Sequence, residues 1–218
     1  MATPDQVRAG QAAYTPWTLR AYDVFVLGFS NRFLWRCPTS GLMDLYARNV
    51  GKRHLDIGVG TGYFLDKTAW PVARPEITLL DLNPHSLEAA ARRIARYQPR
   101  TVTADALQPL TVSGPFDSVG MSYLLHCMPG RLADKCVVFD HIRPALAPGA
   151  AVFGATILQG DAPRSLAAQK LLDFYNRKGI MANAQDNFAD LERELRARFP
   201  DVRLTRRGAV ALFEAKAA

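Results

Sequence analysis

Three glycines at alternate positions, Gly58, Gly60 and Gly62, directly follow an apolar stretch whose pattern predicts a strand over 53–57. Glycine lets the backbone turn sharply, and it lets a ligand approach the main chain where a side chain would exclude it. In an open α/β sheet, such a turn at the carboxyl end of a central strand is where a nucleotide-like ligand binds. The loop by itself is also compatible with a glycine-rich turn that binds nothing, so residues farther along the chain must decide.

The spacing of these glycines differs from the dinucleotide fingerprint G-x-G-x-x-G. Counting from Gly58 puts Tyr63 at the third glycine position, and counting from Gly60 puts Leu65 there. A nicotinamide-dependent enzyme is therefore the weakest of the alternatives.

A carboxylate follows the next predicted strand, which covers 76–80 and delivers Asp81 at its end. An acidic side chain at this place can accept hydrogen bonds from both hydroxyls of a ribose, because its two oxygens take two donors at once. Asp81 alone could be a helix-capping aspartate, since Asn83 and Pro84 begin a predicted helix just after it. Its position relative to the glycine loop makes Asp81 a candidate ribose ligand.

The elements that must position these residues alternate from residue 53 onward between strand and helix patterns. This order predicts a doubly wound α/β fold with a seven-stranded, mostly parallel sheet and an antiparallel last strand. The predicted strands cover 53–57, 76–80, 100–103, 116–123, 150–158, 201–206 and 209–216, with a hairpin at Arg207-Gly208 between the last two. The predicted helices cover 41–49, 61–70, 84–97, 131–143, 166–178 and 188–199. We expect a single domain over 1–218, with a helical extension over 1–50 and an α/β core over 51–218.

The segment before residue 50 contains no convincing strand, but it is rich in aromatic residues. Phe25, Phe29 and Phe33 repeat at every fourth position, so a helix would place them on one face. Such a stripe is most often core packing.

Length and composition are those of an ordinary globular domain, with 218 residues, 49% hydrophobic and 22% charged. No apolar run approaches the roughly 20 residues that span a membrane, and the first residues lack the pattern of a signal peptide. The three cysteines have no metal-ligand spacing, and an odd count argues against a disulfide framework. These features predict a cytoplasmic protein without a membrane partner.

The net charge of +7 favours an acidic partner, nucleic acid included. The arginines are nevertheless dispersed, on the predicted helices 84–97 and 188–199 and near the end of the chain. Scattered arginines are typical of solvated helix faces, so the sequence favours a partner other than nucleic acid.

Three motifs occur in the order typical of one enzyme family. The run L-D-I-G-V-G-T-G over 55–62 resembles the first motif of class I, Rossmann-like S-adenosylmethionine-dependent methyltransferases. F-D-S-V over 116–119 resembles the family's fourth motif, and R-P-A-L-A-P-G over 143–149 is similar to its R-x-L-x-P-G-G turn. Pro144 departs from that turn and should end or kink the preceding helix early. The resemblance covers residues 50–160 well and the last sixty loosely.

The resemblance implies that the protein binds S-adenosyl-L-methionine, releases S-adenosyl-L-homocysteine and uses no metal. Asp56 and the glycine loop would hold the methionine part, Asp81 the ribose, and Asp105 the adenine amino group, with Ala104 and Ala106 leaving room for a flat ring. The full set of cofactor-binding residues it implies is Asp56, Gly58, Gly60, Thr61, Gly62, Asp81, Leu82, Asp105, Ala106 and Ser122.

The acceptor side of the site is less defined by the sequence. His126 follows the predicted strand 116–123 and is the best-placed general base, although a packing role is nearly as well supported. In this family an N-terminal helical extension commonly covers the substrate. Candidate residues of the acceptor pocket are Tyr14, Tyr22, Trp35 and Tyr123, each of which could also simply pack.

The expected activity is methyl transfer to a hydroxyl, nitrogen or carbon of a small molecule, in secondary metabolism. The N/D-P-P-Y signature of many nucleic-acid amino-methyltransferases is absent, because Ser122-Tyr123-Leu124-Leu125 stands at that place. The basic charge keeps an RNA or protein methyltransferase open. A cofactor-binding protein without methyl transfer is the second alternative. The sequence also leaves a homodimer open.

Overall fold

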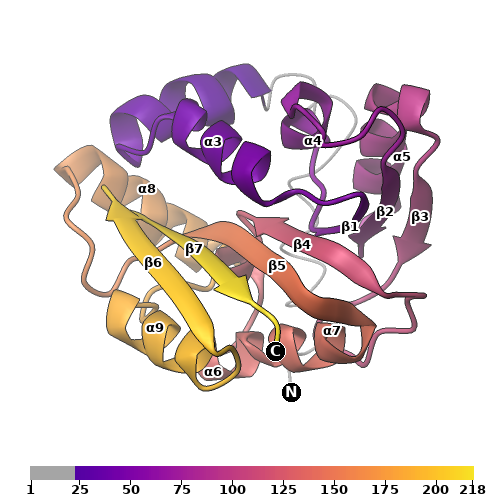
Figure 1. Ribbon diagram of the computed structural model, residues 1–218. Helices are drawn as coiled ribbons and strands as arrows, with labels where there is room; N and C mark the ends of the chain where they lie inside the picture. Colours follow the sequence, from indigo (N-terminus) through magenta and orange to yellow (C-terminus); the bar gives the residue numbers. More distant parts are fainter. Residues whose placement is uncertain (1–22) are drawn as a thin grey trace.

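A computed structural model describes residues 23–218 of the chain, with side chains described from residue 28 onward. Seven strands form one sheet in the order β3-β2-β1-β4-β5-β7-β6 (Figure 1). The strands are β1 (Arg53–Ile57), β2 (Glu76–Asp81), β3 (Arg100–Thr103), β4 (Phe116–Ser122), β5 (Leu146–Ile157), β6 (Asp201–Arg207) and β7 (Val210–Lys216). All pairings from β3 to β5 are parallel, whereas β7 is antiparallel to both β5 and β6. This arrangement confirms the predicted fold class.

Helices cover both faces of the sheet. Figure 1 shows α3, α4 and α5 on one face and α6, α7 and α9 on the other. The helices are a π-helix (Asp23–Leu34), α3 (Thr39–Asn49), α4 (Tyr63–Lys67), α5 (Pro84–Arg93), α6 (Leu132–Lys135), α7 (Val137–Ile142), α8 (Leu166–Arg177) and α9 (Phe188–Arg196). Short 3₁₀ turns occupy Ala95–Tyr97, Leu125–Cys127 and Arg143–Ala145.

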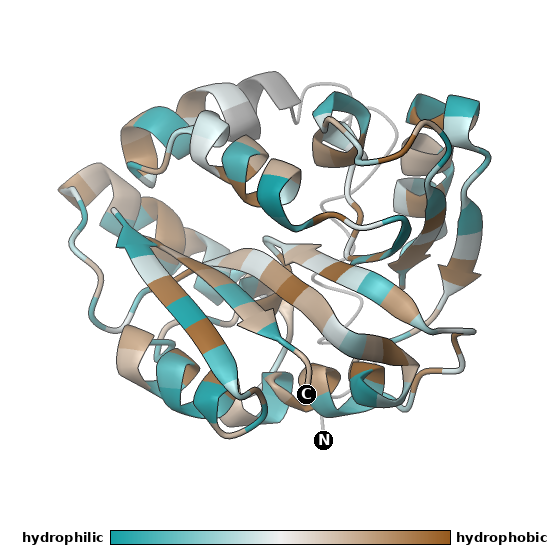
Figure 2. Cartoon of the chain, viewed as in Figure 1, coloured by the Kyte–Doolittle hydropathy of each residue, from teal (hydrophilic) through white to brown (hydrophobic). Residues whose placement is uncertain are grey.

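The core lies along the central strands, which carry long buried runs because helices cover both of their faces. The edge strand β6 alternates instead between exposed and half-buried residues. Figure 2 shows the same alternation as teal and brown segments along β6. Hydropathy along each strand therefore reports how far it lies from the centre of the sheet.

Several helix and strand boundaries differ from the sequence prediction, and two of these differences have clear local reasons. The predicted helix 131–143 is divided into α6 and α7 and ends in the 3₁₀ turn that contains Pro144, as expected from the missing N–H of proline. Strand β5 begins four residues earlier than predicted, at Leu146, where it pairs with Phe116 before the register shifts. The predicted start of α5 is confirmed, since the Asn83 side chain caps the helix by accepting from the His85 amide, but the helix ends at Arg93 and a 3₁₀ turn covers Ala95–Tyr97.

The aromatic stripe near the N-terminus is not core, contrary to the simplest interpretation of its spacing. Phe29 and Phe33 are 50% and 59% exposed, with their rings 5.1 Å apart. The face turned inward instead carries Ser30 and Asn31, both buried, and leads to the buried Trp35. The spacing correctly placed the two rings side by side, but only the packing of the π-helix on the domain decides which face is covered. The side chain of Phe25 lies outside the described residues.

Within the described part of the chain, no helix is both long and apolar enough to cross a membrane.

Candidate active site

A cavity opens at the carboxyl ends of β1, β2, β3 and β4, on the edge of the sheet where parallel strands present their loops. Its walls come from four strand ends and from the turn after β4. The lining includes all ten residues predicted to bind the cofactor, namely Asp56, Gly58, Gly60, Thr61, Gly62, Asp81, Leu82, Asp105, Ala106 and Ser122. The fold therefore brings together residues from the ends of four separate strands.

The glycine loop needs glycine at its first and third positions for two reasons. Gly58 and Gly62 have φ angles of +73° and +71°, a region that side chains rarely adopt. A Cβ at Gly58 would lie 2.8 Å from the Leu124 side chain, and one at Gly62 would lie 3.0 Å from Cα of Ala90. At Gly60 a Cβ would meet nothing within 4 Å, so the main chain there borders open space. The loop thus leaves its backbone accessible to a ligand.

Asp81 ends β2 beside the glycine loop. Its Oδ1 accepts a hydrogen bond from the Asn83 amide at 2.9 Å. Burial raises the pKa of Asp81 to about 6, and the backbone amides of Asn83, Gly60 and Val59 offset part of that shift. A buried carboxylate surrounded by donors is suited to accept further hydrogen bonds from a ligand diol.

This raised pKa predicts pH-dependent binding of the cofactor. The ionised carboxylate is the better acceptor for two ribose hydroxyls, so protonation competes with the ligand. We expect the affinity for S-adenosyl-L-homocysteine to be nearly constant above pH 7 and to fall as the pH drops through about 6, by up to about tenfold per pH unit. Calorimetric titration between pH 5 and 7.5 measures this, and Asp81→Asn should remove most of the dependence. A flat profile in the wild-type protein would contradict the assignment.

Ser122 and Asp105 supply further polar groups to the cavity. The Ser122 hydroxyl oxygen is buried and makes no hydrogen bond of normal geometry within the described residues. A buried hydroxyl without a partner is costly unless a ligand satisfies it. Asp105 accepts from the Leu107 amide at 2.9 Å through Oδ1. These groups fit a polar, nucleoside-containing ligand.

The residues predicted for the acceptor pocket divide into three groups. Tyr123 lines the cavity and has a φ of +63°, and its hydroxyl donates to Asn31 Oδ1 at 2.8 Å. Trp35 does not line the cavity: its ring is only 2% exposed and belongs to the core. Tyr14 and Tyr22 lie outside the described residues. The Tyr123–Asn31 bond ties the π-helix to the cavity wall, which supports the prediction that the N-terminal extension borders the acceptor.

His126 lies behind the cavity wall and is not among the residues that line it. It is buried, and its Nδ1 accepts from the Ile157 amide at 3.2 Å, so the ring proton is on Nε2. Burial, followed by the charge of Lys135, lowers the pKa of His126 to about 3. A general base works best with a pKa near the working pH. The role of general base stays a prediction from the sequence, and this placement favours a supporting role behind Tyr123.

We therefore expect His126→Asn to act on stability more than on chemistry. Losing a buried acceptor and an edge contact with the Tyr123 ring at 5.7 Å should lower the free energy of unfolding by about 1–3 kcal/mol. Turnover per folded protein under saturating cofactor should stay within a few-fold of wild type. A fall of about 10²–10⁴ in turnover with an intact melting curve would instead establish the general base.

Several residues that line the cavity escaped the sequence analysis. Tyr46 comes from α3, and Cys127, Met128 and Pro129 come from the turn after β4. A signal for Tyr46 was present, because it lies four residues after Leu42 and so shares the inward face of that helix. No pattern in the sequence indicates that the three residues of the turn would line the cavity.

The cavity is acidic. Asp56, Asp81 and Asp105 line it, whereas no lysine, arginine or histidine occurs among its described lining residues. In the described part of the chain, no group of three or more His, Cys, Asp or Glu side chains could hold a metal ion. An acidic, glycine-rich cavity at this switch point suits a ligand that carries a nucleoside and positive charge.

Fold and site together define a class I S-adenosylmethionine-dependent methyltransferase, and comparison with known proteins shows that the chain belongs to this family. A family model described as "Methyltransferase domain" matches residues 55–152. The chain is 42% identical to demethylluteothin O-methyltransferase of Streptomyces thioluteus over 96% of this chain and 92% of that protein. It is 38% identical to the physcion biosynthesis cluster O-methyltransferase of Aspergillus chevalieri, over 94% of each chain. The protein is therefore a small-molecule methyltransferase similar to enzymes of secondary metabolism.

Solved structures show the same fold at low identity. The N-methyltransferase NodS of Bradyrhizobium japonicum, in complex with S-adenosyl-L-homocysteine, matches with a TM-score of 0.61 and 15% identity over 98% of this chain and 97% of that chain. Phosphoethanolamine N-methyltransferase 2 of Haemonchus contortus, in complex with S-adenosyl-L-methionine, matches with a TM-score of 0.67 and 18% identity over 94% of this chain and 46% of that chain.

Proposed function

We propose that the protein methylates a hydroxyl oxygen of an uncharged, largely apolar small molecule of secondary metabolism. The observation that carries this proposal is the wall of the cavity beyond the cofactor-binding residues. Most of these further lining residues are apolar or aromatic, among them Phe64, Tyr123, Leu124, Met128 and Pro129. Such a wall suits a flat conjugated ring better than a phosphate, because its described residues offer no cationic side chain.

The residues around this wall bind and orient the acceptor, and they exclude water from it. When bound, S-adenosyl-L-methionine supplies an electrophilic methyl group on a sulfonium. The wall would hold the acceptor oxygen close to that methyl group, and transfer of the methyl to the oxygen would release S-adenosyl-L-homocysteine. The proton of a phenol or enol is acidic enough to pass to water or a weak base, so alignment in a dry pocket can supply much of the acceleration. This chemistry is compatible with a site whose described lining has no histidine.

The names of the relatives support an oxygen acceptor. Demethylluteothin O-methyltransferase, the physcion cluster O-methyltransferase and O-methyltransferase adaD are named for oxygen. N-methyltransferase vrtF of Penicillium aethiopicum, 38% identical to this chain, makes nitrogen the competing acceptor.

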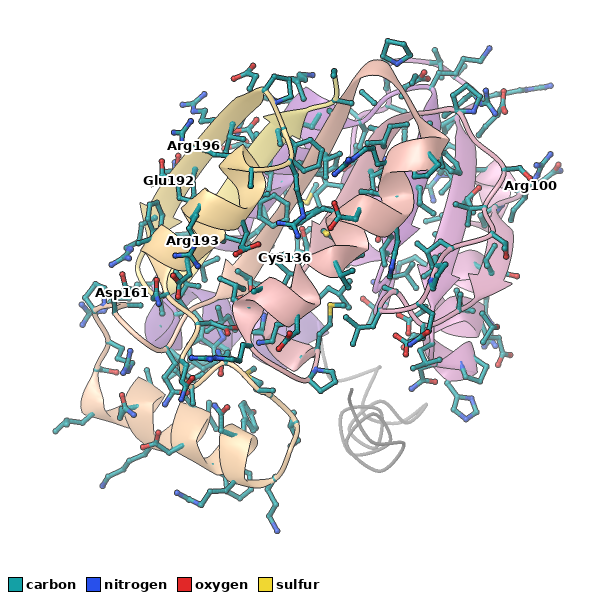
Figure 3. All side chains as sticks on the ribbon, turned by 90° about the horizontal axis from the view of Figure 1, so that it is seen from below. Arg100, Cys136, Asp161, Glu192, Arg193 and Arg196 are labelled. Carbon is teal, nitrogen blue, oxygen red and sulfur yellow. The ribbon has the colours of Figure 1, made fainter. Side chains whose placement is uncertain are left out.

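The surface arginines weaken the proposal of a nucleic-acid substrate. Arg193 and Arg196 on α9 pair with Asp190 and Glu192 at 2.5 and 2.8 Å (Figure 3). Arg198 pairs with Asp140 at 3.0 Å, so much of this positive charge is already matched locally. Local pairing reduces the positive field that a phosphate backbone would require.

The experiment is a screen with a methyl-labelled donor. We expect label transfer to phenols and enols of fused-ring or pyrone type, with little transfer to amines of the same skeletons and none to bulk RNA. Transfer to the amines alone would make nitrogen the acceptor. Transfer to RNA that falls steeply with salt would overturn the small-molecule proposal.

We extend the proposal to the domain organisation of the protein and to its location in the cell. Residues 1–50 would serve as a cap over the acceptor within a single domain that spans the chain. A cytoplasmic location is supported by Cys37 and Cys136, both buried free thiols. Gel filtration with light scattering tests whether the protein forms a homodimer.

A further inference from the structure

A chain of buried polar groups from two neighbouring strands ends on Asp56. The Gly51 amide donates to Ser118 Oγ at 2.7 Å, and that oxygen lies 2.8 Å from His54 Nδ1. The other ring nitrogen of His54, Nε2, lies 3.3 Å from Asp56 Oδ2. His54 and Ser118 are both completely buried. Groups this deep must satisfy one another, because water cannot.

With a neutral imidazole, only one arrangement of protons satisfies the whole chain. Ser118 already accepts from Gly51, so its own proton can go to His54 Nδ1. The proton of the neutral imidazole is then on Nε2 and is donated to Asp56 Oδ2. The opposite tautomer would turn an unprotonated nitrogen toward a carboxylate oxygen. Every hydrogen bond therefore runs toward Asp56.

A second donor reaches the same oxygen from α3. The Tyr46 hydroxyl donates to Asp56 Oδ2 at 2.9 Å. Its ring is held by stacking on Phe64 at 5.1 Å and by edge contact with Phe153 at 5.0 Å. Burial, followed by the Asp56 charge, raises the pKa of Tyr46 well above its ordinary value, so the phenol keeps its proton.

Strand β4 leaves the space that this arrangement needs. A Cβ on Gly120 would lie 2.7 Å from Asp56 Oδ2 and 3.2 Å from His54 Cε1. Any larger residue there would push the carboxylate or the ring out of place.

We propose that Tyr46 and His54 are positioning residues that saturate Asp56 Oδ2 and leave Oδ1 for the ammonium group of the cofactor's amino-acid part. No described residue donates to Oδ1, and Asp56 lines the cavity. Two donors on one oxygen fix the plane of the carboxylate before any ligand arrives, which lowers the ordering cost of binding. This inference rests on the proposed function.

The test compares two ligands that differ in the amino-acid part. S-Adenosyl-L-homocysteine carries the ammonium group, whereas 5′-methylthioadenosine lacks it and keeps the nucleoside and the sulfur. In Tyr46→Phe, calorimetry should show roughly five- to tenfold weaker binding of S-adenosyl-L-homocysteine, from the loss of one hydrogen bond to a charged group. Binding of 5′-methylthioadenosine should stay within about twofold of wild type, since it does not reach Asp56.

Two further variants make the comparison secure. Ser118→Ala removes the group that sets the His54 tautomer, and it should shift the ratio of the two affinities in the same direction by a smaller factor. Tyr175→Phe on α8 removes a hydroxyl from a tyrosine outside the cavity, and it should leave the ratio unchanged. If Tyr46→Phe does not fold by circular dichroism, Ser118→Ala decides by the same criterion.

The outcomes separate this inference from the proposed function. Equal weakening of both ligands, or of neither, would overturn the positioning role while the proposed function stands. Failure of the wild-type protein to bind either ligand would overturn the proposed function and this inference with it.

Discussion

Replacing Asp186 with alanine should lower the free energy of unfolding by about 3–5 kcal/mol, because it leaves a buried ammonium group without its partner. Lys135 Nζ lies 2.6 Å from Asp186 Oδ2 and donates to the Ala182 carbonyl at 2.7 Å. The two side chains are 0% and 2% exposed. Water cannot reach the lysine side chain unless the loop between α8 and α9 opens. Chemical denaturation monitored by circular dichroism measures the loss.

Two comparisons identify the buried charge as the cause. Combining Lys135→Met with Asp186→Asn should restore most of the stability, because no unpaired charge then remains. Glu192→Ala removes the partner of Arg196 in an ion pair whose side chains are 58% and 38% exposed, and it should cost at most about 1 kcal/mol. A double variant no more stable than Asp186→Ala would contradict this explanation.

Asp81→Ala should weaken the binding of S-adenosyl-L-homocysteine by roughly ten- to hundredfold, since it leaves two ribose hydroxyls without an acceptor. The same change should not destabilise the ligand-free protein, because the raised pKa of Asp81 means that keeping its carboxylate ionised at neutral pH costs the folded state free energy. Calorimetry gives the affinity and a melting curve gives the stability.

The matched control is Asp201→Ala, which removes an exposed carboxylate at the start of β6 and should leave binding unchanged. Unchanged affinity in a folded Asp81→Ala protein would remove Asp81 from the site.

The sequence by itself determined the sheet and which strand ends meet at the cavity. Strand and helix periodicities, together with turn residues such as Gly208, are local signals that survive in any tertiary context. Parallel strands also bring their carboxyl ends to one edge. Residues as distant as Asp56, Asp81 and Ser122 could therefore be assigned to one cavity, which they line.

Only the tertiary structure decided which way individual side chains face and what they touch. The spacing of Phe29 and Phe33 is the same whether the stripe is buried or exposed, and packing of the π-helix leaves it exposed. His126 stands just after β4, yet the Ile157 amide on β5 draws its ring away from the cavity lining. Tyr46 meets Asp56 because α3 packs on β5, which is separated from β1 in the sheet only by β4. Such contacts depend on the packing of elements far apart in the chain, and no local pattern records that packing.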